Sequence, residues 1–338
     1  MGKRVTFWGA GKQMHNFIDY VHQHNEIFDD QFVGIVDSCQ DKVGSQIGDF
    51  IIEEVDAIND YNPDYVVVTP VDSAAIFDSL EKRGVSCSIL SLNQYKSQKI
   101  IQYQVKCNSQ KEILGKTTFT CNDKSIVVYT AISKGYDVLL NPAHIIPNAK
   151  YICFTDDSSL KSDIWDIKMV DFGKDSKLGI RKYKVNPHLF FSDADISIWT
   201  DGNLQIIGDL SEYIEKYFKS GNILLFPHQS RYCIYDEAAA CITYQKAKAE
   251  DIIPQILSYR NDNYPYSNGL YLGGCIVRQH NCQSVIETME LWWKHICTFS
   301  QRDQISLPYA LWKTGLPIDL CDENLYENQW IRILGHNN

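Results

Sequence analysis

The stretch "SIWTDGNLQI" at residues 197–206 places a carboxylate and an amide two residues apart, directly after an apolar run. The apolar run is typical of a buried strand, and Asp201-Gly202-Asn203 is typical of the turn that leaves it. Side-chain oxygens at the carboxyl end of a strand are suitable ligands for Mn²⁺ or Mg²⁺ held against a phosphate. The same three residues are also common turn formers, so the tripeptide alone favours turn chemistry over a metal site.

Polar side chains follow other apolar runs of the second half of the chain in the same way. Asp156-Asp157 follow "YICFT", and His228 follows "NILLFP". Ligands of open α/β sheets bind beyond the carboxyl ends of the strands. The repeated placement therefore favours a ligand site that includes Asp201.

Two further segments carry groups that suit a phosphate-bearing ligand. In "RKYKVNPHLFF", Arg181 and Lys184 could reach phosphates and His188 could contact the same ligand, although a solvated basic face and a packed histidine are the plainer interpretations. Gly273-Gly274 lies between two apolar runs, which indicates either a close approach of the backbone to a ligand or a strand bulge.

Length and composition limit the classes of protein to consider. The 338 residues suffice for two domains, and a net charge of −10 argues against non-specific nucleic-acid binding. We find no apolar run near the roughly 20 residues of a membrane span and no signal-peptide core, so association with a membrane surface is the only membrane role left open. The eleven cysteines include no C-x-x-C pair, and we expect free thiols in the cytoplasm.

Residues 1–95 predict a small Rossmann-like domain, because short strands alternate with amphipathic helices. Gly9 and Gly11 match the first two glycines of a dinucleotide fingerprint, Met14 stands at the third, and Asp37 ends the second strand. The domain resembles the module attached to many bacterial surface-polysaccharide enzymes. Because Met14 would crowd the helix–strand contact, we favour a docking domain over a bound NAD. Residues 96–122 are interpreted as a connector that can include a helix.

Six segments occur in order from residue 125 onward: "VVYTAISKGYD", "YICFTDD", "RKYKVNPHLFF", "SIWTDGN", "NGLYLGGCIVRQHN" and "RDQISLPYALWKTGLP". They resemble the glycosyltransferase-like family known from plant pectin and mucilage synthesis and from bacterial polysaccharide clusters. The resemblance implies that residues 123–338 form a catalytic α/β domain of glycosyltransferase A type, with an Asp-x-Asp element for the metal and diphosphate. Asn203 replaces the second Asp of that element, which removes a charge.

The resemblance also implies roles for individual residues and for partners. The donor would be a nucleotide sugar, with a uridine nucleotide favoured, and the acceptor a glycan or lipid-linked glycan in capsule or other polysaccharide synthesis. A hexosyl- or uronosyltransferase is the implied activity, with no nucleic-acid partner. The residues at the end of the first strand would hold the base and ribose of the donor; these are Thr130, Ala131, Tyr136 and Asp137. His336 would be a third metal ligand, and the equal alternative is a residue of a frayed tail. From their place in the chain, we expect His228, Arg231 and Glu237 to line the acceptor side.

Asp303-Gln304 in "RDQISLPY" resembles the Asp-Gln pair beside the reacting sugar in retaining family-eight glycosyltransferases. We therefore expect transfer with retention and assign both residues a catalytic role. The plainer interpretation makes Asp303 the N-cap of a helix that Pro308 keeps short. Two other functions stay open: a non-catalytic scaffold that binds sugar nucleotides, which Asn203 favours, and an NAD-dependent oxidoreductase or epimerase, which Met14 disfavours.

Overall fold

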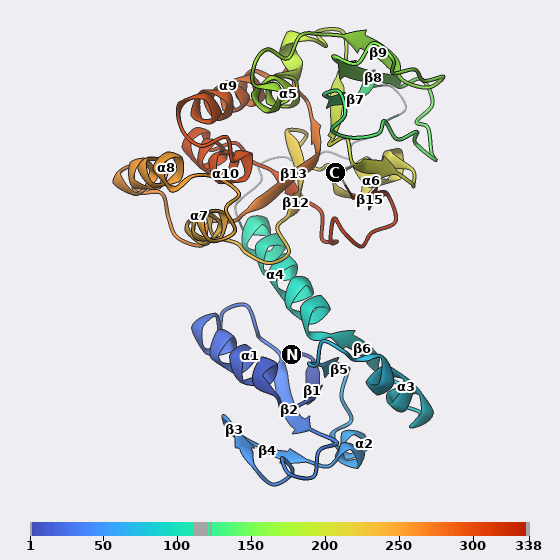
Figure 1. Cartoon of the computed structure of the whole chain (residues 1–338), viewed down its shortest axis with the longest axis vertical. Coiled ribbons are helices and arrows are strands. Elements are labelled where there is room, and N and C mark those ends of the chain that lie inside the picture. Colours follow the sequence, from blue (N-terminus) through green and yellow to red (C-terminus); the bar gives the residue numbers. More distant parts are fainter. Residues whose placement is uncertain (1, 111–120, 122–123, 336–338) are drawn as a thin grey trace. The chain divides into compact units, whose positions relative to one another are not determined.

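The computed structural model describes residues 2–110, 121 and 124–335, and the chain divides into two compact units, 1–103 and 104–338 (Figure 1). The first unit holds a six-stranded sheet in the order β3-β4-β2-β1-β5-β6, parallel except for the β3–β4 pair. Its strands are β1 (Arg4–Trp8), β2 (Gln31–Val36), β3 (Gln46–Ile47), β4 (Phe50–Glu53), β5 (Tyr65–Val68) and β6 (Ser88–Ser91). Its helices are α1 (Lys12–Gln23), α2 (Ile58–Tyr61) and α3 (Ala74–Lys82). The expected Rossmann-like fold is confirmed.

The glycine loop of this unit is built around its own side chains. Gly9 adopts a φ of +114°, and a Cβ there would lie 2.5 Å from Thr69 Oγ1, so the position requires glycine. The Asp37 carboxylate, which follows β2, accepts hydrogen bonds from the backbone N–H groups of Ala10 at 2.7 Å and Cys39 at 2.9 Å. Met14 is fully buried. The acidic group that a ribose would need is thus engaged by the loop itself.

The second unit contains a seven-stranded sheet in the order β14-β12-β13-β10-β7-β8-β9. Its strands are β7 (Ile126–Ile132), β8 (Lys150–Thr155), β9 (Asp166–Met169), β10 (Ile196–Thr200), β12 (Ile223–Pro227), β13 (Tyr271–Arg278) and β14 (Asp319–Leu320). All neighbours are parallel except β13, which runs antiparallel to both β10 and β12. This is the expected α/β domain of glycosyltransferase A type.

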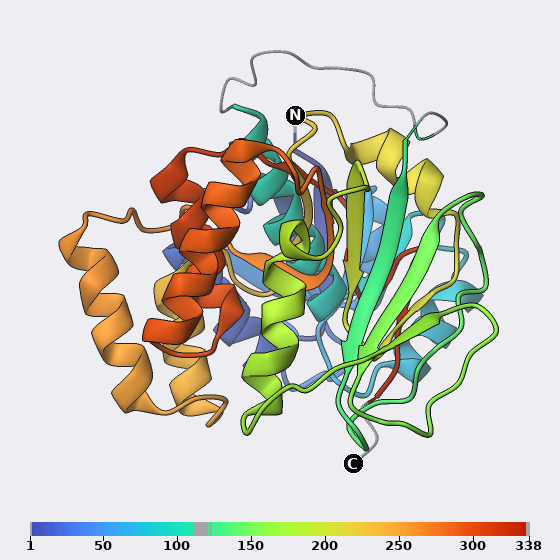
Figure 2. The same cartoon turned by 90° about the horizontal axis from the view of Figure 1, so that it is seen from above.

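Side chains alternate between two hydrophobic layers of this sheet. Ile198 of β10 faces one layer with α6 (Leu210–Tyr217), while Trp199 faces the other. The second layer is covered by α5 (Ser176–Val185), α9 (Gln283–Thr298) and α10 (Asp303–Thr314), seen as lime and orange-red helices on one side of the sheet in Figure 2. Pro308 does not keep α10 short, because α10 runs for twelve residues with Pro308 inside.

Smaller elements complete the second unit. The helices α7 (Ile234–Thr243) and α8 (Ala249–Asn261) pack with α10 in one buried cluster, and β11 (Leu204–Ile206) pairs with β15 (Ile331–Ile333). The helix α4 (Leu92–Ser109) spans the division between the units, so most of it falls in the expected connector. Its Gln104 amide donates to the backbone oxygen of His228 at 2.9 Å, which ties residue 104 to the second unit.

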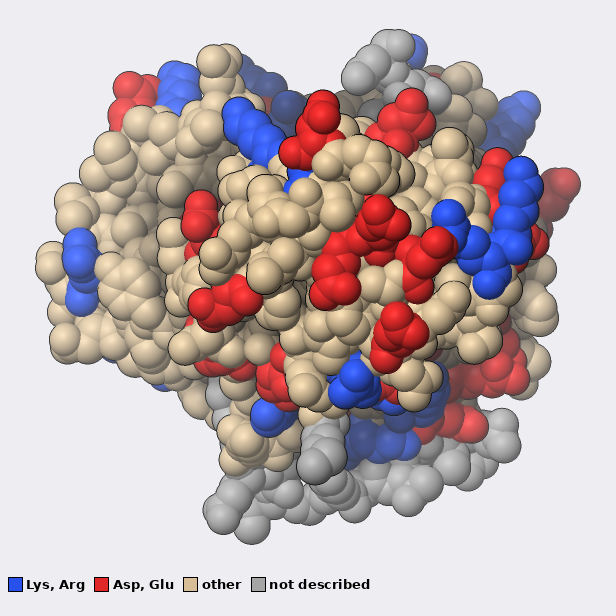
Figure 3. All heavy atoms as spheres, turned by 90° about the horizontal axis from the view of Figure 1, so that it is seen from below, with Lys and Arg blue, Asp and Glu red and all other residues tan. Residues whose placement is uncertain are grey.

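The surface carries charges of both signs. Figure 3 shows Asp and Glu side chains spread over one face, with Lys and Arg side chains among them. Within the described residues, no helix combines the length and the hydropathy needed to cross a bilayer.

Candidate functional site

A cavity of about 950 Å³ lies in the second unit at the carboxyl ends of β7 and β10. Its size falls in the usual range of small-molecule sites. Most residues singled out from the sequence line it. They come from both strand ends, α5, β13, the segment after β12, α7 and the start of α10; they are Ala131, Tyr136, Asp137, Arg181, Lys184, Asp201, Asn203, His228, Arg231, Glu237, Gly273, Gly274, Asp303 and Gln304.

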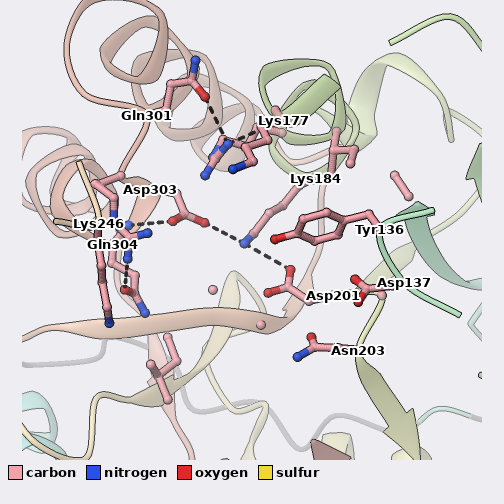
Figure 4. A pocket seen from close by; sticks show the side chains of 18 of the residues that line it. Tyr136, Asp137, Lys177, Lys184, Asp201, Asn203, Lys246, Gln301, Asp303 and Gln304 are labelled. Atoms are coloured by element: carbon pink, nitrogen blue, oxygen red, sulfur yellow. Dashed lines mark hydrogen bonds and ion pairs between the residues drawn. The ribbon is translucent and has the colours of Figure 1, made fainter. Parts of the chain in front are cut away.

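Three charged side chains form the centre of this cavity (Figure 4). Lys184 Nζ lies 2.7 Å from Asp303 Oδ2 and 3.3 Å from Asp201 Oδ1. The side chains of Lys184 and Asp303 are 7% and 12% exposed, whereas that of Asp201 is 41% exposed. One ammonium therefore links the end of α5 to the start of α10 and to the end of β10.

The electrostatics keep this pair ionised. Burial disfavours the charge on Lys184, but the carboxylates of Asp201 and Asp303 raise its pKa above the ordinary value. Burial alone would raise the pKa of Asp303, yet Lys184 and Arg181 hold it well below its usual range. Asp303 is thus a fixed negative charge rather than a proton donor.

Neighbouring groups fix the Asp201 carboxylate. Its Oδ1 accepts a hydrogen bond from Trp199 Nε1 at 2.7 Å, in addition to the contact with Lys184. Trp199 is fixed in turn, because it is buried in the sheet. The other carboxylate oxygen, Oδ2, has no hydrogen-bond partner among the described side chains, so it can meet a ligand.

The glycines of β13 allow the charged centre to pack against the strand. A Cβ on Gly273 would lie 2.9 Å from Lys184 Nζ and 3.2 Å from Asp303 Oδ2. A Cβ on Gly274 would meet Leu204 and Leu325 at 3.2 and 3.3 Å. Both interpretations of this Gly-Gly pair are seen. The register of β13 against β12 shifts between Leu272 and Ile276, as at a strand bulge, and Gly273 lies close to the charges of the site.

Helical periodicity explains the basic face of the cavity. Lys177, Arg181 and Lys184 lie three and four residues apart on α5 and all line the cavity. His188, expected to contact the same ligand, does not line it. The helix ends at Val185 because the residue before Pro187 is biased away from helical backbone, and His188 falls in the following 3₁₀ turn.

Thr130 was expected beside Ala131 at the end of β7, but it does not line the cavity. Successive residues of a strand point to opposite faces, so only one of two neighbours can face a given ligand. Ala131 lines the cavity, and Thr130 is buried.

The described residues offer a divalent cation two oxygen ligands. These are Asp201 Oδ2 and the amide oxygen of Asn203, whose Nδ2 donates to the backbone oxygen of Leu334 at 3.1 Å and so turns the oxygen away from that partner. Hard cations accept such ligands and take the remaining positions from phosphate and water. No cluster of three acidic, His or Cys ligands occurs in the described part of the chain, so phosphate and water would have to supply the remaining ligands of a cation bound here. His336 lies outside the described residues.

A second charged cluster lies where the acceptor residues were expected. Arg231 Nε donates to Glu237 Oε2 at 2.7 Å, and Glu237 is only 1% exposed. His228 Nδ1 accepts two backbone N–H groups, those of Ser230 and Arg231, both at 3.1 Å. Burial and the Arg231 charge lower the pKa of His228 to about 4, so this imidazole is neutral at neutral pH.

Some lining residues were missed in the sequence. Gln301 accepts from Arg181 at 3.3 Å and donates to Asp175 at 2.6 Å, and it therefore fixes Arg181 against α10. Arg302 donates to Gln304 at 3.2 Å. Both directly precede Asp303-Gln304, so their position beside that pair was the available signal. Lys177 could have been found from its spacing of four residues to Arg181, whereas Lys246 had no such signal.

Comparisons with known proteins agree with this architecture. The family described as "TOD1/MUCI70, glycosyltransferase-like domain" matches residues 164–332, and "C2185-like, N-terminal" matches residues 1–88. The chain is 26% identical over 212 residues to a protein of Arabidopsis thaliana named "Probable hexosyltransferase MUCI70". That alignment covers 54% of this chain and 36% of the relative, so the chain spans little more than a third of its length. The first family match runs from β9 into β15 and includes most of the residues that line the cavity, and the chain belongs to the TOD1/MUCI70 glycosyltransferase-like family.

Proposed function

We propose that the chain transfers a sugar from a uridine-diphosphate sugar to a glycan or lipid-linked glycan, with retention of anomeric configuration. The observation that carries this proposal is the buried Lys184 between Asp201 and Asp303 at the carboxyl edge of the sheet. An ammonium held in place by two carboxylates can contact the sugar and stabilise the departing diphosphate without having to move.

The donor fits the side of the cavity formed by β7, α5 and β10. Ala131 and the following loop with Tyr136 and Asp137 would face the base and ribose, and Asp137 suits a uracil N–H or ribose hydroxyls. Lys177 and Arg181 on α5 would face the phosphates. The acceptor would enter from the side of Arg231, whose guanidinium is held by Glu237.

A divalent cation would be held by Asp201 and Asn203, and when bound it would supply positive charge to the diphosphate. Because this ligand set carries one charge, we expect binding of the cation to depend on the donor. Lys184 would also supply positive charge to the diphosphate, because its pKa is raised and it stays an ammonium.

Retention is favoured by the state of Asp303. An inverting reaction needs a general base whose pKa lies near the working pH. Asp303 is ion-paired, buried and has a strongly lowered pKa, so it is a weak base. Its carboxylate is better suited to hold sugar hydroxyls, with Gln304 beside it.

The test is direct. The protein is incubated with a panel of nucleotide sugars, and donor hydrolysis or transfer is followed by NMR, which reports the configuration at the anomeric carbon. We expect turnover of a uridine-diphosphate sugar and an α-linked product from an α-linked donor. A β-linked product would refute retention, and binding without any turnover would favour the alternative of a non-catalytic scaffold.

A further inference from the structure

Gln304 is oriented by a neighbour that can only donate hydrogen bonds. Arg302 Nη2 lies 3.2 Å from Gln304 Oε1. Arginine has no acceptor atom, so the amide oxygen must face Arg302 and the amide NH₂ must face away from it. Gln304 lines the cavity, and its NH₂ has no hydrogen-bond partner among the described residues. Figure 4 places Gln304 on the side of Asp303 opposite Lys184.

Arg302 is held in turn by a buried carboxylate. Its Nη2 lies 3.8 Å from Glu237 Oε1, and Arg231 Nη2 lies 2.7 Å from the other oxygen, Glu237 Oε2. Glu237 comes from α7 and is 1% exposed, so its charge is almost fully desolvated. The Cys241 thiol, one turn later on α7, donates to Oε1 at 3.2 Å and fixes the carboxylate further.

We propose that Glu237 is a positioning residue that acts through Arg302 to present the Gln304 NH₂ to the reacting sugar. This inference rests on the proposed function. Glu237 is 1% exposed and its charged partners are Arg231 and Arg302, so it is suited to act through these partners rather than by direct contact with an acceptor. The group presented is an N–H donor, so its target is an oxygen of the donor sugar or of the leaving diphosphate.

Loss of the Glu237 charge would release Arg302 toward its other acidic neighbour. Arg302 already contributes to the lowered pKa of Asp303. Without Glu237, Arg302 would move away from Gln304 and toward Asp303. The Gln304 amide would then lose its fixed orientation, while the donor-binding side of the cavity, on β7 and α5, would be unchanged.

The test is a kinetic double-mutant cycle in the full chain. We expect Glu237→Gln and Gln304→Ala each to lower kcat about 10-fold, with the donor KM within about two-fold of wild type. In the Gln304→Ala background, Glu237→Gln should lower kcat further by less than about two-fold, because both changes remove the same interaction. A full second 10-fold loss would overturn the proposal, as would an unchanged kcat in Glu237→Gln.

A matched control separates positioning from folding. Asp319 is a buried carboxylate that accepts hydrogen bonds from the backbone N–H groups of Lys219 and Ser220 and from the Ser220 hydroxyl. It does not line the cavity. Asp319→Asn should lower Tm and leave kcat unchanged. If it lowers kcat as much as Glu237→Gln does, the effect of Glu237 is structural and the proposal fails.

The orientation of Gln304 can also be measured without a substrate. The side-chain amide signals of Gln304, labelled with ¹⁵N-glutamine and assigned by their loss in Gln304→Ala, should shift in Glu237→Gln. A shift in a protein that turns over no nucleotide sugar would uphold the positioning and refute the proposed function. Unshifted amide signals in an active enzyme would refute the positioning alone.

Discussion

The buried pair of Lys184 and Asp303 can be tested by its effect on stability. The two atoms lie 2.7 Å apart, and the side chains are 7% and 12% exposed. Removing one partner of such a pair leaves a buried charge and costs about 3–5 kcal/mol. We expect Lys184→Met to lower the free energy of unfolding by about 3 kcal/mol, since it leaves two carboxylates facing each other. Asp303→Asn should cost less, about 2 kcal/mol, because Asp201 still faces the ammonium at 3.3 Å.

The double variant makes this reasoning refutable. Removing both charges leaves no uncompensated ion in the pair. The double variant should therefore lower the free energy of unfolding by about 3 kcal/mol, whereas the two single losses add up to about 5 kcal/mol. The difference, about 2 kcal/mol, is the coupling energy of the pair. Urea unfolding followed by tryptophan fluorescence suits the measurement, because six of the seven tryptophans lie in residues 104–338. A loss of 3 kcal/mol should lower the midpoint by about 1 to 1.5 M urea. Additive losses, or single variants that unfold as wild type does, would refute the described pair.

The pH dependence follows from the directions of the two shifts. The lowered pKa of Asp303 stabilises the fold above the unfolded pKa of about 4, and this contribution is lost as pH falls through the folded pKa. The raised pKa of Lys184 stabilises the fold below the unfolded pKa of about 10.4, and this contribution is lost as pH rises through the folded pKa. The difference in the free energy of unfolding between wild type and Lys184→Met should therefore be constant between about pH 5 and pH 9. A difference that changes within this window would contradict the assignment.

Four other changes test the site and the division of the chain. Asp201→Ala should fold and lose at least about 100-fold in turnover. Asn203→Asp should tighten Mn²⁺ binding by adding a charge, which titration calorimetry with UDP present can measure. Turnover that is insensitive to EDTA would exclude a required metal. Gly273→Ala should lower kcat by about 10-fold or more while the protein stays folded, because the new Cβ would lie 2.9 Å from Lys184 Nζ; unchanged kinetics would show that the close approach is dispensable. A chain beginning at Gln104 should fold and bind donor by itself, since the cavity lies wholly in the second unit; a soluble, monodisperse fragment that binds no donor would assign part of the site to the first unit.

The sequence was sufficient where local rules decide the structure. The Rossmann-like alternation and the strand that ends directly before Asp201 follow from period-2 and period-3.6 patterns, and both are present. It failed where a neighbouring residue decides the outcome. His188 continues the spacing of the basic face, but Pro187 ends the helix first. Thr130 and Ala131 are adjacent in sequence, yet the strand turns only one of them toward the cavity.

Contacts between distant segments could not be read from the sequence at all. Glu237 and Arg302 are 65 positions apart, and neither has a spacing that indicates an ion pair. The pair exists because α7 and α10 pack together through a shared hydrophobic cluster. Such contacts depend on the helix packing, which a single sequence does not specify residue by residue.

The position of Asp303 unites two interpretations that the sequence left open. Asp303 is the first residue of α10, and the N-cap is Arg302, so the expected N-cap role belongs to its neighbour. The carboxylate still lies at the positive end of the helix, where its Oδ1 accepts the backbone N–H of Gln304 at 3.1 Å. Its Oδ2 faces Lys184 at 2.7 Å. The helix start and the ammonium therefore act on the same carboxylate from two sides, and both lower its affinity for a proton. A group held ionised in this way can hold a charge or a hydroxyl through a reaction but cannot shuttle a proton, which is why we propose retention and electrostatic rather than acid–base catalysis for this site.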